Sequence, residues 1–168
     1  MSENYRVALF YAKEAHGDQK RKYSNEPYWK HPNAVARILE SIGCPEHIVI
    51  AGLLHDVVED TDKTIGDICA VFGSKVANVV AQVTDVSKKE DGNRKQRKLL
   101  DKNHLALSDY SGATVKLADL IHNTMSITKH DKEFAKIYLK EKADLLRVLK
   151  HGHIGLYEIA SLMVRELL

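Results

Sequence analysis

The chain has 168 residues, which is the length of one domain and enough to enclose a hydrophobic core. Its formal charge of +2 gives no overall bias toward nucleic acid, and no apolar run approaches the ~20 residues of a membrane span. No long apolar segment of the kind found in secretory signals follows the first residues. Cys44 and Cys69 lack metal-ligand spacing, so we expect a cytoplasmic protein without disulfides.

Helical periodicity runs through the first part of the chain. A stripe of five apolar residues predicts the first helix, and these are Val7, Ala8, Tyr11, Ala12 and Ala15. A second stripe over 35–42 predicts the next helix, with Pro32 in its first turn and Gly43 near its end. A third helix is expected over about 46–58.

The next two helices are indicated by their end residues. Thr64 and Asp67 have the spacing of a capping box, and Gly73 is suited to closing the short helix that they begin. Ser74 is then expected to cap a helix with a largely β-branched apolar face, formed by Val76, Ala77, Val79, Val80 and Val83.

The second half of the chain predicts four more helices, separated by polar segments. Residues 85–92 are expected to form a loop and 109–112 a turn. The helices are expected over 94–107, 115–125, 132–150 and 154–168. Strand signals are weak throughout, and neither a repeat nor an interdomain linker is present. We therefore predict an all-α fold of roughly seven to nine helices in a single domain over 1–168.

Residues 51–60 carry four ionisable side chains within or beside an apolar run, namely His55, Asp56, Glu59 and Asp60. A buried charge needs a partner or an ion to offset its desolvation. In a helix, His55 would share a face with Glu59, and Asp56 would share the neighbouring face with Asp60. One helical turn could thus present an imidazole and a carboxylate to a divalent cation.

Two further polar groups lie in other helices. His31 precedes Pro32, and Asp119 and Asn123 are four residues apart in an apolar segment. Taken singly, His31 could be a surface residue, and Asp119 could simply pair with Lys116. Taken together, polar groups in separate apolar helices need a shared reason, and a cation bound by two imidazoles and two carboxylates supplies one. Such nitrogen and oxygen ligands suit Mn, Fe, Co or Zn.

These motifs resemble the HD phosphohydrolase superfamily. The closest resemblance is to the alarmone (ppGpp) hydrolases of the RelA/SpoT type, including their small stand-alone members. It covers about residues 5–150. The residue blocks that carry it are Ala-His-Gly-Asp-Gln at 15–19, Arg-Lys-Tyr-Ser-Asn-Glu-Pro-Tyr at 21–28, His-Pro at 31–32, Leu-Leu-His-Asp-Val-Val-Glu-Asp-Thr at 53–61, Phe-Gly at 72–73, Lys-Leu-Ala-Asp at 116–119 and His-Asn at 122–123.

The resemblance implies an HD-domain helical bundle that removes pyrophosphate from the ribose 3′ position of ppGpp or pppGpp. The implied metal ligands are His31, His55, Asp56 and Asp119, with Mn²⁺ as the usual ion and Fe²⁺, Co²⁺ or Zn²⁺ as alternatives. Glu59 and Asp60 are implied to position and deprotonate the attacking water. The implied nucleotide-binding residues are Arg21, Lys22, Ser24, Asn123 and Tyr138, while Lys95, Arg97 and Lys142 stay unassigned among the basic residues for the remaining phosphates.

The chain departs from bifunctional members of the family at Leu120 and Phe134, where those proteins have arginine. Two alternatives therefore remain open: a phosphatase for another nucleotide, such as NADPH with its 2′-phosphate, and a non-catalytic nucleotide-binding module. The basic run over 88–98 lacks aromatic residues and is interrupted by Glu90 and Asp91, so nucleic acid is not an expected partner. We expect a small-molecule nucleotide partner and no membrane association, with a homo-oligomer left open.

Overall fold

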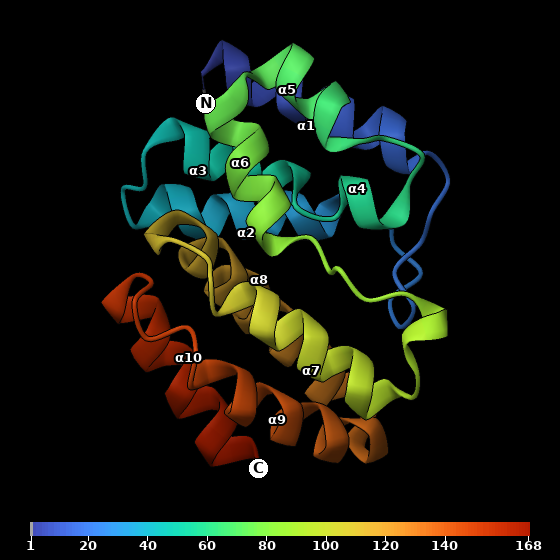
Figure 1. Cartoon of the computed structure of the whole chain (residues 1–168), viewed down its shortest axis with the longest axis vertical. Helices are drawn as coiled ribbons and strands as arrows, with labels where there is room; N and C mark the ends of the chain where they lie inside the picture. The colour runs from blue at the N-terminus through green and yellow to red at the C-terminus, as the bar shows by residue number, and fades with distance from the viewer. Residues whose placement is uncertain (1) are drawn as a thin grey trace. The chain divides into compact units, whose positions relative to one another are not determined.

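The computed structural model describes residues 2–168, and every regular element in that range is helical (Figure 1). These residues form ten α-helices and one 3-10 helix and contain no strand, which confirms the predicted all-α class. An isolated β-bridge joins Lys20 to Pro27. The chain separates into two compact units, Met1–Thr84 (unit 1) and Asp85–Leu168 (unit 2). None of the described helices has both the length and the apolar character required to cross a lipid bilayer.

Unit 1 is built around one enclosed helix. Its elements, blue to green in Figure 1, are α1 (Glu3–His16), α2 (Lys30–Ser41), α3 (Glu46–Leu54), α4 (Val57–Asp60), α5 (Ile65–Phe72) and α6 (Ser74–Val83). Helix α3 packs against α1, α2 and α6, and all of its residues from Ile48 to Leu54 are buried. A helix that is apolar on all sides is stable only when other elements enclose it. The charged residues that directly follow α3 therefore lie next to the core.

The predicted helix 46–58 is interrupted at His55 and Asp56. Helix α3 ends at Leu54, the two residues form a turn with right-handed helical backbone angles, and α4 begins at Val57. Nδ1 of His55 hydrogen-bonds the carbonyl of Gly52 at 2.9 Å. In a continuous helix the amide of Asp56 would use that carbonyl, so the histidine ring competes with the backbone at the interruption. Counting α3 and α4 as one interrupted helix gives nine α-helices in the described chain, within the predicted seven to nine.

The ends of α5 agree with the sequence, whereas the start of α6 does not. The hydroxyl of Thr64 accepts a hydrogen bond from the amide of Asp67, whose carboxylate accepts one from the amide of Thr64, so the capping box is confirmed. Gly73 ends α5 with a φ of 82°, and its N–H donates to the carbonyl of Cys69. The prediction that Ser74 caps α6 is wrong, because Gly73 precedes α6 directly and Ser74 is already its first helical residue.

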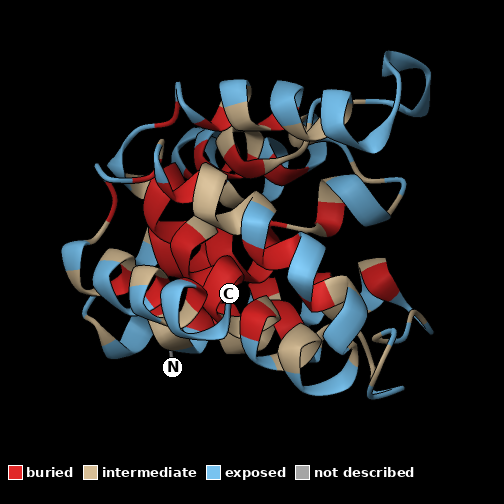
Figure 2. Cartoon of the chain, turned by 90° about the horizontal axis from the view of Figure 1, so that it is seen from below, coloured by how far each residue is buried: buried red, intermediate tan, exposed pale blue. Residues whose placement is uncertain are grey.

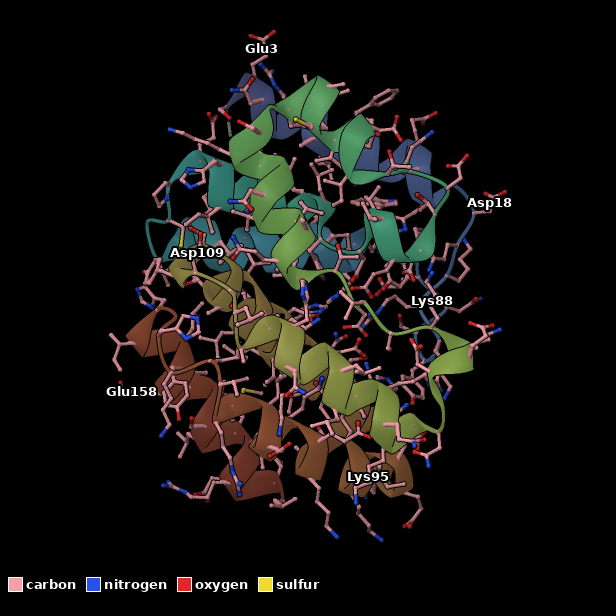
Figure 3. All side chains as sticks on the ribbon, viewed as in Figure 1. Glu3, Asp18, Lys88, Lys95, Asp109 and Glu158 are labelled. Carbon is pink, nitrogen blue, oxygen red and sulfur yellow. The ribbon has the colours of Figure 1, made fainter. Side chains whose placement is uncertain are left out.

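Unit 2 contains η1 (Lys89–Asp91), α7 (Arg94–Leu105), α8 (Tyr110–His130), α9 (Lys132–Leu146) and α10 (Ile154–Leu167). Helix α8 packs against α9 and α10, and every residue of it from Gly112 to Ile121 except Lys116 is buried. The turn expected over 109–112 is instead the first turn of α8. Asp109, labelled in Figure 3, caps it by accepting hydrogen bonds from the amides of Ser111 and Gly112.

Burial follows the helix faces in both units. In Figure 2 most helices alternate between buried and exposed turns, as expected for amphipathic helices. Two of the largest completely buried side chains are imidazoles, those of His31 and His55, each with 1% of its surface exposed. Buried imidazoles need polar partners, so the surroundings of these two residues identify the candidate site.

Candidate metal centre

Close packing of α2 on α3 positions the two buried histidines of unit 1. A Cβ atom at Gly52 would lie 2.5 Å from Cδ1 of Leu39 and 3.5 Å from Cα of Ala36, so only glycine fits this helix contact without a shift of its neighbours. His31 lies in the first turn of α2, and His55 directly follows α3. Their ring centroids are 5.2 Å apart.

Asp56 completes a cluster with the two histidines. One ligand atom from each of His31, His55 and Asp56 lies within 4.8 Å of the others. Nε2 of His55 is 3.2 Å from Oδ1 of Asp56, and Nε2 of His31 is 3.4 Å from Oδ2. Three of the four predicted metal ligands therefore meet within unit 1.

The tautomer of His55 shows that this cluster suits a cation. A carbonyl only accepts hydrogen bonds, so Nδ1 of His55 must carry a proton to bond Gly52. In the neutral imidazole Nε2 then has a lone pair that faces a carboxylate oxygen 3.2 Å away. Two facing lone pairs repel unless a proton or a metal ion lies between them. An imidazole that donates its other N–H to a backbone carbonyl is also the usual arrangement of a metal-bound histidine.

Asp56 is held in its charged form. Burial alone would raise the pKa of this carboxyl, but the imidazoles of His55 and His31, when they carry a positive charge, keep the pKa well below its usual range. The hydroxyl of Tyr28 also donates to Oδ2 of Asp56 at 2.8 Å. The carboxylate is thus ionised and fixed in orientation, as a metal ligand must be.

Asp119, the fourth predicted ligand, belongs to α8 of unit 2. Its Oδ1 accepts a hydrogen bond from Nδ2 of Asn123 at 2.6 Å, and its Oδ2 lies 3.3 Å from the ammonium of Lys116. The predicted i, i+4 relation of Asp119 and Asn123 is thus a direct contact. Its membership in the ligand set stays a prediction.

The acidic pair Glu59 and Asp60 lies on α4, where both residues are exposed. Oδ2 of Asp60 accepts a hydrogen bond from Nε2 of Gln19 at 3.0 Å. Oε1 of the same glutamine is 2.8 Å from Nδ1 of His16, which must be the donor because an amide oxygen only accepts. Gln19 therefore orients the Asp60 carboxylate and is itself oriented by a buried histidine.

Residues 20–27, the segment predicted to contact the nucleoside, form a loop between α1 and α2. The bridge from Lys20 to Pro27 closes it. The guanidinium of Arg21 lies over the ring of Tyr28, with 5.7 Å between its carbon and the ring centroid. Since Tyr28 also bonds Asp56, this loop is joined to the histidine cluster through one side chain. Lys22 and Ser24 lie exposed on the same loop.

The predicted nucleotide-binding residues of unit 2 are more enclosed. Tyr138 is 5% exposed, and its hydroxyl lies 3.4 Å from the carbonyl of Leu120 and 3.3 Å from Oγ1 of Thr124, both on α8. Asn123 is half-buried beside Asp119. Their roles toward a nucleotide stay predictions.

Sequence reasoning assigned no role to Tyr28, Gln19 or His16. The contacts of Tyr28 with Asp56 and of Gln19 with Asp60 depend on tertiary packing, so residue spacing alone could not show them, and His16 reaches Asp60 only through Gln19. The available signal was their presence in the residue blocks that carry the family resemblance, at 15–19 and 21–28.

Comparison with known families agrees with this geometry. The family model described as HD domain matches residues 8–149, which include every residue of the cluster as well as Asp119. The chain belongs to the HD domain family. The match extends over residues of both units.

Similar proteins of this family are also identified. A protein of Mycoplasma pneumoniae named as a probable guanosine-3′,5′-bis(diphosphate) 3′-pyrophosphohydrolase is 37% identical over 92% of the chain and 22% of its own length. The Aquifex aeolicus protein with that activity in its name is 36% identical over 95% of the chain and 23% of its own length. The chain thus spans less than a quarter of the length of these curated relatives.

A solved structure matches nearly the whole HD domain chain. It belongs to a metazoan ortholog of SpoT that is described as hydrolysing ppGpp and acting in starvation responses. The TM-score is 0.88 at 29% sequence identity, and the match covers 99% of this chain and 96% of the other. The all-helical fold is therefore shared with a protein of similar size.

Proposed function

We propose that the chain is a metal-dependent phosphohydrolase that converts ppGpp to GDP, and pppGpp to GTP, by releasing pyrophosphate from the ribose 3′ position. The observation that carries this proposal is the meeting of His31, His55 and Asp56, three donors for a divalent cation, in a buried cluster. The names of the similar Mycoplasma and Aquifex proteins and the activity of the metazoan SpoT ortholog support the choice of substrate.

His31, His55, Asp56 and Asp119 would hold the cation, for which we propose Mn²⁺ ahead of Fe²⁺, Co²⁺ and Zn²⁺. Such an ion lowers the pKa of a bound water and stabilises negative charge on phosphoryl oxygens. His55 is suited to this task because its bond to Gly52 fixes the ring with Nε2 toward the cluster. Asp56 is suited because it stays ionised at neutral pH.

Asp60, together with Glu59, is proposed to take the proton from the attacking water. The water oxygen forms a bond to phosphorus and the bond from phosphorus to the ribose 3′ oxygen breaks. That oxygen takes up a proton from solvent as it leaves, and Asp60 then releases its proton to solvent. Asp60 needs a fixed direction for this role, and the hydrogen bond from Gln19 provides it. Arg21, Lys22 and Ser24 on the 20–27 loop, with Asn123 and Tyr138, are proposed to bind the nucleotide.

Incubation of the Mn²⁺-loaded chain with ppGpp tests the proposal, and GDP and pyrophosphate should appear in equal amounts. Asp60→Asn should abolish this turnover while leaving the metal content unchanged, because Asp60 lies outside the histidine cluster. The proposal fails if the wild-type chain releases neither product.

Leu120 and Phe134 stand where bifunctional family members have arginine, so the preferred nucleotide could differ. Assays with a panel of other nucleotides test this. The panel includes NADPH, scored by release of phosphate. Inactivity toward every nucleotide except the alarmones would remove the alternative of a different substrate. An Asp60→Asn chain that behaves like wild type in binding and turnover would instead favour the non-catalytic module.

The location and assembly of the chain are also proposals. Cys44 and Cys69 are free thiols, which supports a reducing compartment and hence the cytoplasm. A single functional domain over 1–168 is supported by a family match that extends over residues of both units. A nucleotide is the proposed small-molecule partner, without nucleic acid, and a homo-oligomer stays open.

A further inference from the structure

Unit 2 contains a cavity of about 390 Å³ between α7, α8 and α9. Six basic and four acidic side chains contribute to its lining, together with a few apolar ones. A cavity of this size is large enough for a small polar ligand. The excess of cations over carboxylates points to a ligand with negative charge.

Most of the charged side chains in the lining neutralise one another. Arg94 on α7 makes two hydrogen bonds to the carboxylate of Glu141 on α9, at 2.7 and 2.8 Å. The ammonium of Lys98 lies 2.8 Å from Oδ2 of Asp85, and Lys102 forms an ion pair with Asp144. The pairs of Arg94 and Lys102 join α7 to α9, the pair of Lys98 joins α7 to the segment before η1, and all three leave little charge for a ligand.

Lys142 on α9 is different from the other cations in the cavity. Among residues 2–168, no carboxylate lies within ion-pair distance of its ammonium, which sits over the ring of Tyr138 at 5.0 Å from the centroid. Burial, opposed by Asp119 and Asp85 but reinforced by the nearby charges of Lys116 and Lys98, lowers the pKa of Lys142 to about 8. At neutral pH Lys142 is therefore a largely enclosed cation that Asp119 and Asp85 attract only from beyond ion-pair distance.

We propose that this cavity is a binding site for a phosphate or diphosphate group, with the ammonium of Lys142 as its main anion contact. An enclosed ammonium without a counter-ion is unfavourable, and an entering phosphate would relieve that cost. Lysine binds phosphate as a point charge, so it needs no bidentate geometry from its neighbours. Lys116 also lines the cavity, but its ammonium lies 3.3 Å from Oδ2 of Asp119, so Lys142 stays the main positive charge for a ligand.

The phosphate in this site could belong to a bound nucleotide or be a free inorganic anion. The site itself follows from the contacts of Lys142 and stands without the proposed hydrolysis. Only its use by the nucleotide substrate rests on the proposed function.

Calorimetric titration of the full chain with inorganic pyrophosphate at low ionic strength tests the site. Lys142→Met removes the ammonium and keeps an unbranched side chain, whereas Lys140→Met removes the same charge from an exposed position of α9. We expect Lys142→Met to weaken binding by about tenfold or more and Lys140→Met by less than about twofold. A melting temperature at or above that of wild type will show that Lys142→Met is folded.

Three results would overturn the site. They are no binding of pyrophosphate by the wild-type chain, equal affinity of wild type and Lys142→Met, and an equal loss in both variants, which would reflect net charge alone. Pyrophosphate binding needs no turnover, so a chain that binds it without hydrolysing ppGpp would contradict the proposed function and support this site.

The kinetics of Lys142→Met with ppGpp distinguish the two sources. A higher KM with unchanged kcat would assign the site to phosphates of the substrate. Weaker pyrophosphate binding with an unchanged KM would assign it to a free anion. Both results support an anion site in the α7–α9 cavity.

Discussion

Asp56 is the residue on which the candidate metal centre depends most. Its two carboxylate oxygens each lie beside one of the two imidazoles, and one of them accepts a hydrogen bond from the hydroxyl of Tyr28. The carboxylate remains ionised although it is largely enclosed. Enclosing a carboxylate is costly, and the cost is offset only when cations or hydrogen-bond donors surround it. Metal binding at Asp56 therefore depends on the packing of α2 against α3, which positions the two imidazoles beside it.

Asp56→Asn should abolish metal binding, because the amide carries no charge and presents only one oxygen to an ion. We expect bound manganese to fall from about one equivalent to below about 0.1, as measured by elemental analysis after removal of free metal. Asp62→Asn is the matched control, since the Asp62 side chain is 88% exposed. Retention of full metal content in Asp56→Asn would refute the ligand assignment.

Gln19 is predicted to matter for the rate and not for metal binding. Gln19→Ala removes the hydrogen bond that orients Asp60, and we expect kcat for ppGpp to fall by about tenfold with unchanged metal content. Asp18→Asn, at the exposed neighbouring residue labelled in Figure 3, should behave like wild type. Equal kcat values for Gln19→Ala and wild type would show that Asp60 needs no such support.

The enclosed ammonium of Lys142 predicts that the stability difference between the wild-type chain and Lys142→Met depends on pH. Its pKa is about 8 in the folded chain against 10.5 as its ordinary value, so below pH 8 folding must enclose a charge. Between these two values the unfolded chain binds a proton that the folded chain has released, and stability rises with pH. Lys142→Met should thus raise the free energy of unfolding by about 1–3 kcal/mol at pH 7.

Denaturant unfolding of both proteins at several pH values measures this difference. The advantage of Lys142→Met should shrink from pH 8 to pH 10.5, because the wild-type lysine becomes neutral in the folded state. A constant difference over this range would mean that the lysine titrates normally.

At the scale of elements, Asp101 of α7 anchors the first segment of unit 2. Its carboxylate accepts hydrogen bonds from the amides of Val86 and Ser87 and from the hydroxyl of Ser87, and it lies 3.3 Å from the ammonium of Lys98. With 3% of its surface exposed, this carboxylate takes the place of backbone pairing in a segment without regular structure.

Asp101→Ala should destabilise the chain by about 2–3 kcal/mol, because two partly buried amides and one hydroxyl lose their acceptor at once. Thermal or denaturant unfolding measures the loss, and Lys95→Ala at an exposed position of the same helix should change stability by less than about 0.5 kcal/mol. If both substitutions have the same small effect, the Asp101 contacts do not hold the segment in solution.

The helix ends show which structural features neighbouring residues alone can predict. Thr64, Asp67 and Gly73 act within three or four residues of themselves, and their predicted roles at the ends of α5 are confirmed. Ser74 and the first turn of α8 were assigned wrongly, because more than one residue in each stretch could serve as the cap. The break at His55 involves a side chain bonding to the carbonyl of Gly52, which helical periodicity does not reveal.

At the scale of the whole molecule, the metal is predicted to stabilise the folded chain. Ligands as distant in sequence as His31 and His55 are brought together only by folding, so the metal is expected to bind the folded state preferentially. At a free metal concentration near 100 times Kd, the stabilisation would be about 2.7 kcal/mol, or a rise in Tm of about 5–10 °C.

Differential scanning calorimetry with manganese and with a chelator measures this shift. The chelator should lower the Tm of wild type and leave that of Asp56→Asn unchanged. A shift of equal size in Asp56→Asn would place the stabilising ion elsewhere in the chain.

The sequence by itself determined the all-α class, most helix positions and the family, because periodicity, end residues and ordered motifs are properties of neighbouring residues. It also indicated the residue types of a metal site. The tertiary structure decided that His31 meets His55 and Asp56 and that Gln19 supports Asp60. It also placed Lys142 in a cavity lining where, among residues 2–168, its ammonium forms no ion pair. These contacts join segments far apart in sequence, and they depend on the packing of whole helices, such as α2 against α3 at Gly52, which no local pattern encodes.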